Sequence, residues 1–175
     1  MRWLLITVVA YACLVVETSV FRPGALAVQI DGHWVRPDLV LVLGLFLAFF
    51  FDPPEVFIAA WGLGLASDLV SVAGRLGLQA LLFCVVLYLV SRLRGILSRT
   101  RVLTQFLTAI ATVFVVHLAW YMTTRLLGSG APWILRSVEE SLLDALYAAV
   151  LAPYVFWALL WLRAPLGISS GSAPD

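Results

Sequence analysis

The sequence predicts an all-α integral membrane protein with six transmembrane helices, and composition is the first reason. Hydrophobic residues make up 63% of the 175 residues, charged residues make up 12%, and the mean hydropathy is +1.04. Soluble domains are about 45–50% apolar and about 25% charged. The chain therefore has too few polar side chains to cover a soluble globule. The second reason is a pattern of six apolar runs separated by short polar connections.

These runs predict one membrane domain over residues 1–163 and a flexible cytoplasmic tail over residues 164–175. The first run lacks a small-residue cleavage site followed by a polar segment, so we expect a retained span and not a signal peptide. The expected helices cover about residues 3–21, 37–51, 56–73, 76–91, 102–123 and 138–162.

The connection between the first two helices carries a hairpin signal. Asp31-Gly32 separates two short β-prone runs. Asp-Gly in this setting is the strongest short-range signal for a β-hairpin. We therefore predict a small hairpin within residues 27–35, lying on the membrane face.

The second helix is short for a membrane span. Its apolar run over residues 39–51 would cover only about 20 Å as a helix, against about 30 Å of hydrocarbon. Three arrangements fit this length. The helix begins at Pro37, where proline suits the first turn, it lies inside the bundle, or it thins the bilayer locally. A re-entrant segment is the alternative.

The third expected helix contains a single carboxylate, Asp68. A charge at membrane depth costs several kcal/mol unless it faces protein or water. Asp68 either binds a ligand, a proton or a partner's cation, or it is a structural carboxylate near a helix end. In the second case it pairs with Arg75 or with a neighbouring hydroxyl, Ser67 or Ser71. The Gly74 turn follows closely, which favours the structural interpretation.

Small residues precede Asp68 in the same helix. Gly62 and Ala66 form a small-xxx-small pattern, and Gly64 lies between them. Such residues let two helix backbones approach closely. We expect another helix of the same chain to pack against them.

Two other carboxylates lie near expected helix ends. Glu17 is late in the first helix, where we expect exposure at the interface and a pair with Arg22. Asp38 follows Pro37 at the start of the second helix, where a carboxylate complements the helix dipole.

The start of the last helix carries a polar group. Ser137 and Glu140 fit a capping box, which predicts that the helix begins there. Spacings of three and four residues bring Arg136 beside Glu139 and Glu140, and Glu140 beside Asp144. This group suggests a partner site. No His or Cys accompanies it, so we expect no metal site.

His117 lies inside the fifth expected helix. An intramembrane His is a candidate functional residue, and the simpler interpretation is a core His hydrogen-bonded to Thr112 or Thr123. The chain shows no nucleophile motif, phosphate-binding glycine loop or Cys/His cluster. We therefore expect no catalytic residue and no cofactor, and predict that the protein is not an enzyme.

Arginine positions predict the orientation. The densest basic cluster lies between the fourth and fifth helices and consists of Arg92, Arg94, Arg99 and Arg101. The positive-inside rule places this connection in the cytoplasm. Six spans then put both termini in the cytoplasm and the hairpin outside.

The region from Arg36 to Leu81 resembles the bacterial rod shape-determining protein family MreD. Its characteristic stretch has P-D-L in one span, G-x-x-x-D-x-x-S in the next, and G-L-x-A-L after a short turn. The residues that fit are Pro37, Asp38, Gly64, Asp68, Ser71, Gly77, Leu78, Ala80 and Leu81. Members commonly carry His two residues after the glycine of the G-L-x-A-L stretch. This chain has Gln79 at that position.

The resemblance implies a non-catalytic, multi-pass component of the cell-elongation (rod) complex in the bacterial cytoplasmic (inner) membrane. Such a protein supports lateral-wall peptidoglycan synthesis and cell shape. The implied direct partner is an MreC-like protein with one membrane span. The implied wider partners are MreB, RodZ and the peptidoglycan synthases, with membrane lipid and without nucleic acid.

The family is also similar in architecture to the substrate-binding subunits of energy-coupling-factor transporters, which hold a ligand near the outer face. A six-helix subunit that binds a small, vitamin-type molecule is therefore the alternative function. The candidate structural or pocket-rim residues are Asp38, Asp68, Arg75 and Glu140, and the candidate helix-packing residues are Gly62, Gly64 and Ala66.

Overall fold

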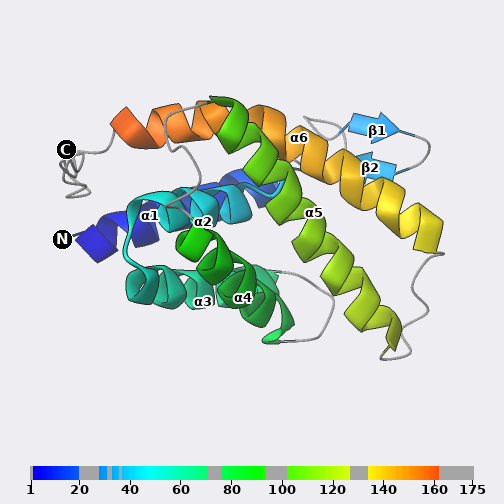
Figure 1. Ribbon diagram of the computed structural model, residues 1–175, viewed down its shortest axis with the longest axis horizontal. Helices are drawn as coiled ribbons and strands as arrows, with labels where there is room; N and C mark the ends of the chain where they lie inside the picture. Colours follow the sequence, from blue (N-terminus) through cyan, green and yellow to red (C-terminus); the bar gives the residue numbers. More distant parts are fainter. Residues whose placement is uncertain are drawn as a thin grey trace.

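A short central helix, α2 (Leu39–Phe50), organises the fold, and every residue from Leu39 to Phe49 is buried. A computed structural model shows it in contact with all the other helices (Figure 1). These are α1 (Arg2–Ser19), α3 (Pro53–Val70), α4 (Leu78–Leu93), α5 (Val102–Leu126) and α6 (Ile134–Trp161). The structure describes residues 2–19, 28–30, 33–35, 37–70, 76–93, 102–126 and 134–161.

The burial of α2 explains its length. A helix that is apolar on all sides is stable when surrounded by other apolar elements, and α2 lies inside the bundle, one of the three expected arrangements. It begins at Leu39 and not at Pro37, because Asp38 is its N-cap and accepts a hydrogen bond from the Leu41 N–H. Phe46 and Phe49 both pack edge-on against Phe156 of α6.

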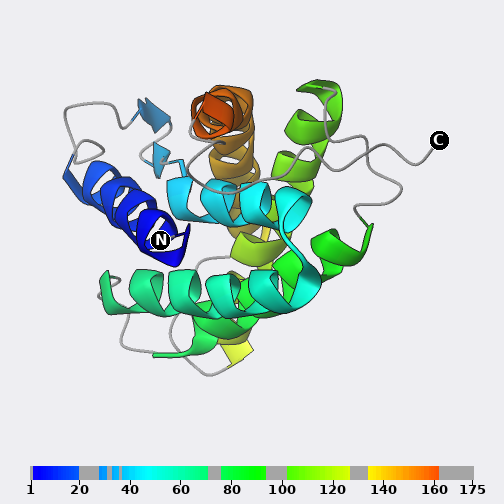
Figure 2. The same ribbon diagram turned by 90° about the vertical axis from the view of Figure 1, so that its left-hand side faces the viewer.

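Four of the remaining helices form two closely packed pairs, α3 with α4 and α5 with α6, and α1 packs against α2. Figure 2 shows α3 running beneath α2, with α1 beside them. α3 begins at Pro53, earlier than expected. The Asp52 carbonyl accepts a hydrogen bond from the Val56 N–H at 2.9 Å, which makes Asp52 the cap and places proline in the first turn, where it is favoured.

The outer surface of the bundle is apolar. Exposed side chains include Tyr11 (69%), Leu81 (60%) and Trp157 (72%), and contiguous apolar surface of this kind is typical of contact with lipid or protein. Among the described helices, Val102–Leu126 and Arg136–Trp161 are long and apolar enough to cross a membrane.

The predicted hairpin is confirmed. Strand β1 (Val28–Ile30) pairs antiparallel with β2 (His33–Val35), with Gln29 opposite Trp34. β2 contacts α6, so the hairpin lies at the end of the bundle where α6 begins (Figure 1).

The expected start of α6 is wrong. The helix begins at Ile134, so Ser137 and Glu140 lie inside it and do not form a capping box. The Ser137 carbonyl accepts a hydrogen bond from the Ser141 hydroxyl at 2.7 Å. Arg136 donates to Glu140 at 2.9 Å, four residues along, and this pair stabilises the first turns of the helix.

Candidate functional site

The buried acidic residues of the described chain gather at one end of the bundle, on the right in Figure 1, where α5 ends and α6 begins. Asp38 lies at the start of α2 and Asp68 near the end of α3. Glu140 and Asp144 lie in the first half of α6. A carboxylate is costly to bury unless it is paired or hydrogen-bonded, so the partners of each one indicate its role.

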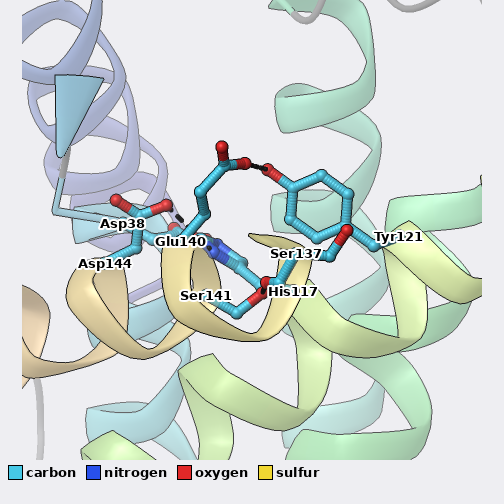
Figure 3. Close-up of polar contacts among 7 residues, drawn as sticks. All are labelled: Asp38, His117, Tyr121, Ser137, Glu140, Ser141 and Asp144. Carbon is cyan, nitrogen blue, oxygen red and sulfur yellow. Dashed lines mark hydrogen bonds and ion pairs between the residues drawn. The ribbon is translucent and has the colours of Figure 1, made fainter. Parts of the chain in front are cut away.

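Asp38, His117 and Asp144 form a central polar cluster that joins α2, α5 and α6 (Figure 3). The Nε2 atom of His117 lies 3.5 Å from Oδ2 of Asp38, and Nδ1 lies 3.6 Å from Oδ2 of Asp144. A protonated imidazole has an N–H on each side, so one ring can face both carboxylates. The two side chains of Asp38 and Asp144 are only 8% and 11% exposed.

Asp38 has two structural roles, one for each oxygen. Its Oδ1 accepts a hydrogen bond from the Leu41 N–H at 2.8 Å and caps α2, while Oδ2 faces His117. Capping satisfies a backbone donor that the helix itself cannot satisfy. The start of the central helix is thereby connected to α5.

Glu17 of α1 also meets the start of α2, and its expected exposure at the interface is wrong. Its Oε2 is buried and has no hydrogen-bond partner. Its neighbours there are the Asp38 carboxylate and the backbone of Leu39 and Val40, so a second acidic side chain meets the N-terminus of α2. Arg22, its expected partner, lies outside the described residues.

Glu140 lies one turn before Asp144 in a second polar group. Its Oε1 accepts a hydrogen bond from Arg136 at 2.9 Å, and its Oε2 accepts one from the Tyr121 hydroxyl at 3.4 Å. Figure 3 shows Glu140 pointing toward Tyr121 above the ring of His117. Arg136 is 61% exposed, whereas Glu140 is 11% exposed.

Asp68 caps a helix other than its own. Its two oxygens accept hydrogen bonds from the N–H groups of Gly77, Gln79 and Ala80, at 2.9, 3.2 and 3.2 Å. Gly77 occupies the N-cap position of α4, since its carbonyl accepts from the Leu81 N–H, and it has a φ of 98°. Glycine brings no capping side chain, so Asp68 from α3 supplies the acceptor. Arg75, its expected partner, lies outside the described residues.

The three candidate packing residues, Gly62, Gly64 and Ala66, do not all contact the same helix. A Cβ added at Gly64 would lie 2.3 Å from the Ala80 Cα and 2.8 Å from its nitrogen, so α3 and α4 meet there at backbone distance. A Cβ added at Gly62 would have no heavy atom within 4 Å. Gly62 and Ala66 line an apolar groove between α1 and α3.

The central polar cluster was not found from the sequence. We expected His117 to bond Thr112 or Thr123, but Thr123 donates to its own helix, to the Ala119 carbonyl. The sequence did contain a signal for part of this cluster. His117 lies as far before the expected end of the fifth helix as Asp144 lies after the expected start of the sixth. Residues placed in this way lie at the same depth in an antiparallel pair.

The arrangement can hold protons, stabilise helix starts and contact a polar ligand. Within the described ranges, no group of three or more His, Cys, Asp or Glu side chains is arranged to hold a metal ion.

Comparison with known proteins gives the family. The family described as rod shape-determining protein MreD matches residues 1–162, a range that includes the hairpin and all six described helices. No curated protein and no solved structure matches the chain. The match extends on both sides of the motif from Arg36 to Leu81. The chain belongs to the MreD family of rod shape-determining proteins, which are bacterial inner-membrane proteins.

Proposed function

We propose that this chain is a non-catalytic component of the rod complex that binds an MreC-like protein with one membrane span. In this role it supports lateral-wall peptidoglycan synthesis together with MreB, RodZ and the peptidoglycan synthases. The family match over residues 1–162 is the observation that carries the proposal. The alternative, a vitamin-type binding subunit, has no support from the comparisons, and the likeness to energy-coupling-factor subunits stays a prediction.

The groove between α1 and α3 is the surface that we propose for the partner. It encloses about 350 Å³ and is lined by Trp3, Ile6, Thr7, Ala10, Tyr11, Leu14, Ile58, Ala59, Gly62, Leu63 and Ala66. Its α1 residues extend over about 16 Å at 1.5 Å per residue. The groove is therefore long enough to receive about three turns of a helix.

The occupant that fits the groove is the single membrane span of the partner. The lining is mainly apolar, and its smallest members, Ala10, Ala59, Gly62 and Ala66, leave room for a helix backbone. Helices in membranes associate through such small residues because close packing replaces lipid contacts. Tyr11 and Ile58 of this lining are 69% and 59% exposed and would contact the bound helix.

The test is co-purification of the MreC-like protein from the native membrane with variants of the groove. Gly62→Leu and Ala66→Leu fill the groove and should reduce the recovered partner at least fivefold. Ala111→Leu is the matched control, because Ala111 is exposed on α5, away from the groove. Normal recovery with both groove variants would exclude this surface. Absence of any single-span elongation partner, with normal cell shape after depletion, would exclude the function.

A further inference from the structure

A second cavity, distinct from the groove, lies between α4, α5 and α6. It encloses about 170 Å³ and is lined by Gln79, Val116, His117, Trp120, Tyr121 and Asp144. A water molecule takes up about 30 Å³ in the liquid, so the space exceeds what a single water needs. His117 is 22% exposed, which shows that the cavity can be reached from outside.

The lining combines carboxylate and aromatic groups around one space. Asp144 contributes a carboxylate, and the rings of Trp120 and Tyr121 stand edge to face with centroids 5.3 Å apart. Aromatic faces attract cations. Carboxylate oxygens accept more than one hydrogen bond each, so Asp144 can face His117 and also accept from a ligand.

The surroundings add acidic groups. Asp38 lies on the far side of His117, and Glu140 accepts a hydrogen bond from Tyr121. The central polar cluster thus contains two carboxylates for one imidazole, which favours a cationic ligand over an anionic one.

The position of the cavity suits a group that arrives from the membrane surface. Gln79 is the second residue of α4, and Figure 1 shows α5 and α6 reaching beyond the α3–α4 pair at this end. The start of α4 therefore borders the cavity on one side, and α5 and α6 border it on the other. The exposed guanidinium of Arg136 binds Glu140, whose other oxygen accepts a hydrogen bond from Tyr121 of the cavity lining. A guanidinium can also pair with a phosphate oxygen.

We infer that this cavity binds a primary ammonium group, supplied by a phosphatidylethanolamine headgroup or by a small free amine. The ammonium lies against Trp120 and Tyr121 and donates hydrogen bonds to Asp144. The site is separate from the partner groove and does not depend on the proposed function.

The test uses the purified full chain in detergent, with thermal stability and native mass spectrometry as readouts. The probes are phosphatidylethanolamine, phosphatidylglycerol and free ethanolamine. Phosphatidylethanolamine should raise the unfolding temperature and be retained in the mass spectrum. Trp120→Leu and Asp144→Asn should weaken its binding at least fivefold. Trp157→Leu, which removes a 72% exposed tryptophan from α6, should change binding less than twofold.

Each outcome decides the inference. Stabilisation by phosphatidylethanolamine alone identifies the lipid headgroup as the ligand, and stabilisation by ethanolamine as well identifies the ammonium from either source. Equal binding of phosphatidylglycerol would overturn the inference, and so would equal behaviour of Trp120→Leu and Trp157→Leu. If Asp144→Asn does not fold, Trp120→Leu decides, because it leaves the central polar cluster intact.

Discussion

At the scale of single residues, Asp68 replaces the N-cap side chain that α4 lacks. Three N–H groups at the start of α4 donate to its two oxygens. Asp68→Asn keeps one acceptor oxygen and points an amide NH2 toward backbone donors. Loss of charged hydrogen bonds of this kind costs about 1–3 kcal/mol. We expect that decrease in the free energy of unfolding, measured by chemical denaturation in detergent.

Glu139→Gln is the control for Asp68→Asn, because it removes a carboxylate that is exposed on α6. Its free energy of unfolding should stay within about 0.5 kcal/mol of the parent, the usual range for surface changes. If Asp68→Asn folds with unchanged stability yet loses the rod-complex partner, the structural interpretation of this carboxylate is wrong.

His117 occupies a different kind of position, between two carboxylates from separate helices. His117→Leu removes the imidazole and leaves Asp38 and Asp144 facing an apolar side chain. Removing one member of a buried charged group costs about 3–5 kcal/mol, and we expect a loss of that size. Adding Asp38→Asn to His117→Leu should recover part of it. A double variant less stable than His117→Leu would show that the imidazole is not what balances Asp38.

At the scale of elements, the contact between α3 and α4 depends on one glycine. Gly64→Ala places a Cβ 2.3 Å from the Ala80 Cα, and overpacking of this kind costs about 1–3 kcal/mol. Gly62→Ala meets open space and removes a glycine from a helix interior, a change worth about 0.5–1 kcal/mol in favour of the helix. The free energy of unfolding of Gly64→Ala should therefore be lower than that of Gly62→Ala by more than about 1 kcal/mol, measured by chemical denaturation in detergent. Equal stabilities would exclude the close approach at Gly64.

The sequence could predict elements whose signals are local. Asp31-Gly32 sufficed for the hairpin, and the apolar runs sufficed for six helices. The start of α6 was misplaced because the Ser137–Glu140 pattern also fits a helix that is already under way. The Gly62–Ala66 pattern did not reveal that the backbone contact of α3 with α4 occurs at Gly64, because both glycines carry the same local signal.

At the scale of the whole molecule, the candidate site depends on which helix ends meet. Glu17, Asp38, His117 and Asp144 come from α1, the start of α2, α5 and α6, two pairs of consecutive helices that are far from each other in the sequence. Each residue alone suited a simpler explanation, such as interface exposure or a helix cap. Their assembly follows from the burial of α2, which brings its N-terminus against α1 and α5. Helix positions in the sequence could have paired His117 with Asp144, but only the packed arrangement shows that Asp38 at the start of α2 meets the same imidazole.

The number of membrane crossings is a property of the whole chain that labelling can test. We propose that all six helices are embedded and that both termini are cytoplasmic. The hairpin then lies outside, whereas crossing by α5 and α6 alone would leave it on the side of the N-terminus. The structure contains two free cysteines, Cys13 and Cys84, which are first replaced by Ala. A cysteine at His33 should react with a membrane-impermeant maleimide in intact cells.

The control for this labelling is a cysteine at Ser98, between α4 and α5, in the connection that carries the densest arginine cluster. Positive residues are retained on the cytoplasmic side, so Ser98→Cys should react only after the membrane is permeabilised. If His33→Cys also reacts only after the membrane is permeabilised, the result would support crossing by α5 and α6 alone. Labelling of Ser98→Cys in intact cells, with His33→Cys protected, would show the opposite orientation. The end of the bundle that holds the central polar cluster would then lie on the cytoplasmic side. The ammonium site would then face the inner leaflet, since its residues belong to that end of the bundle.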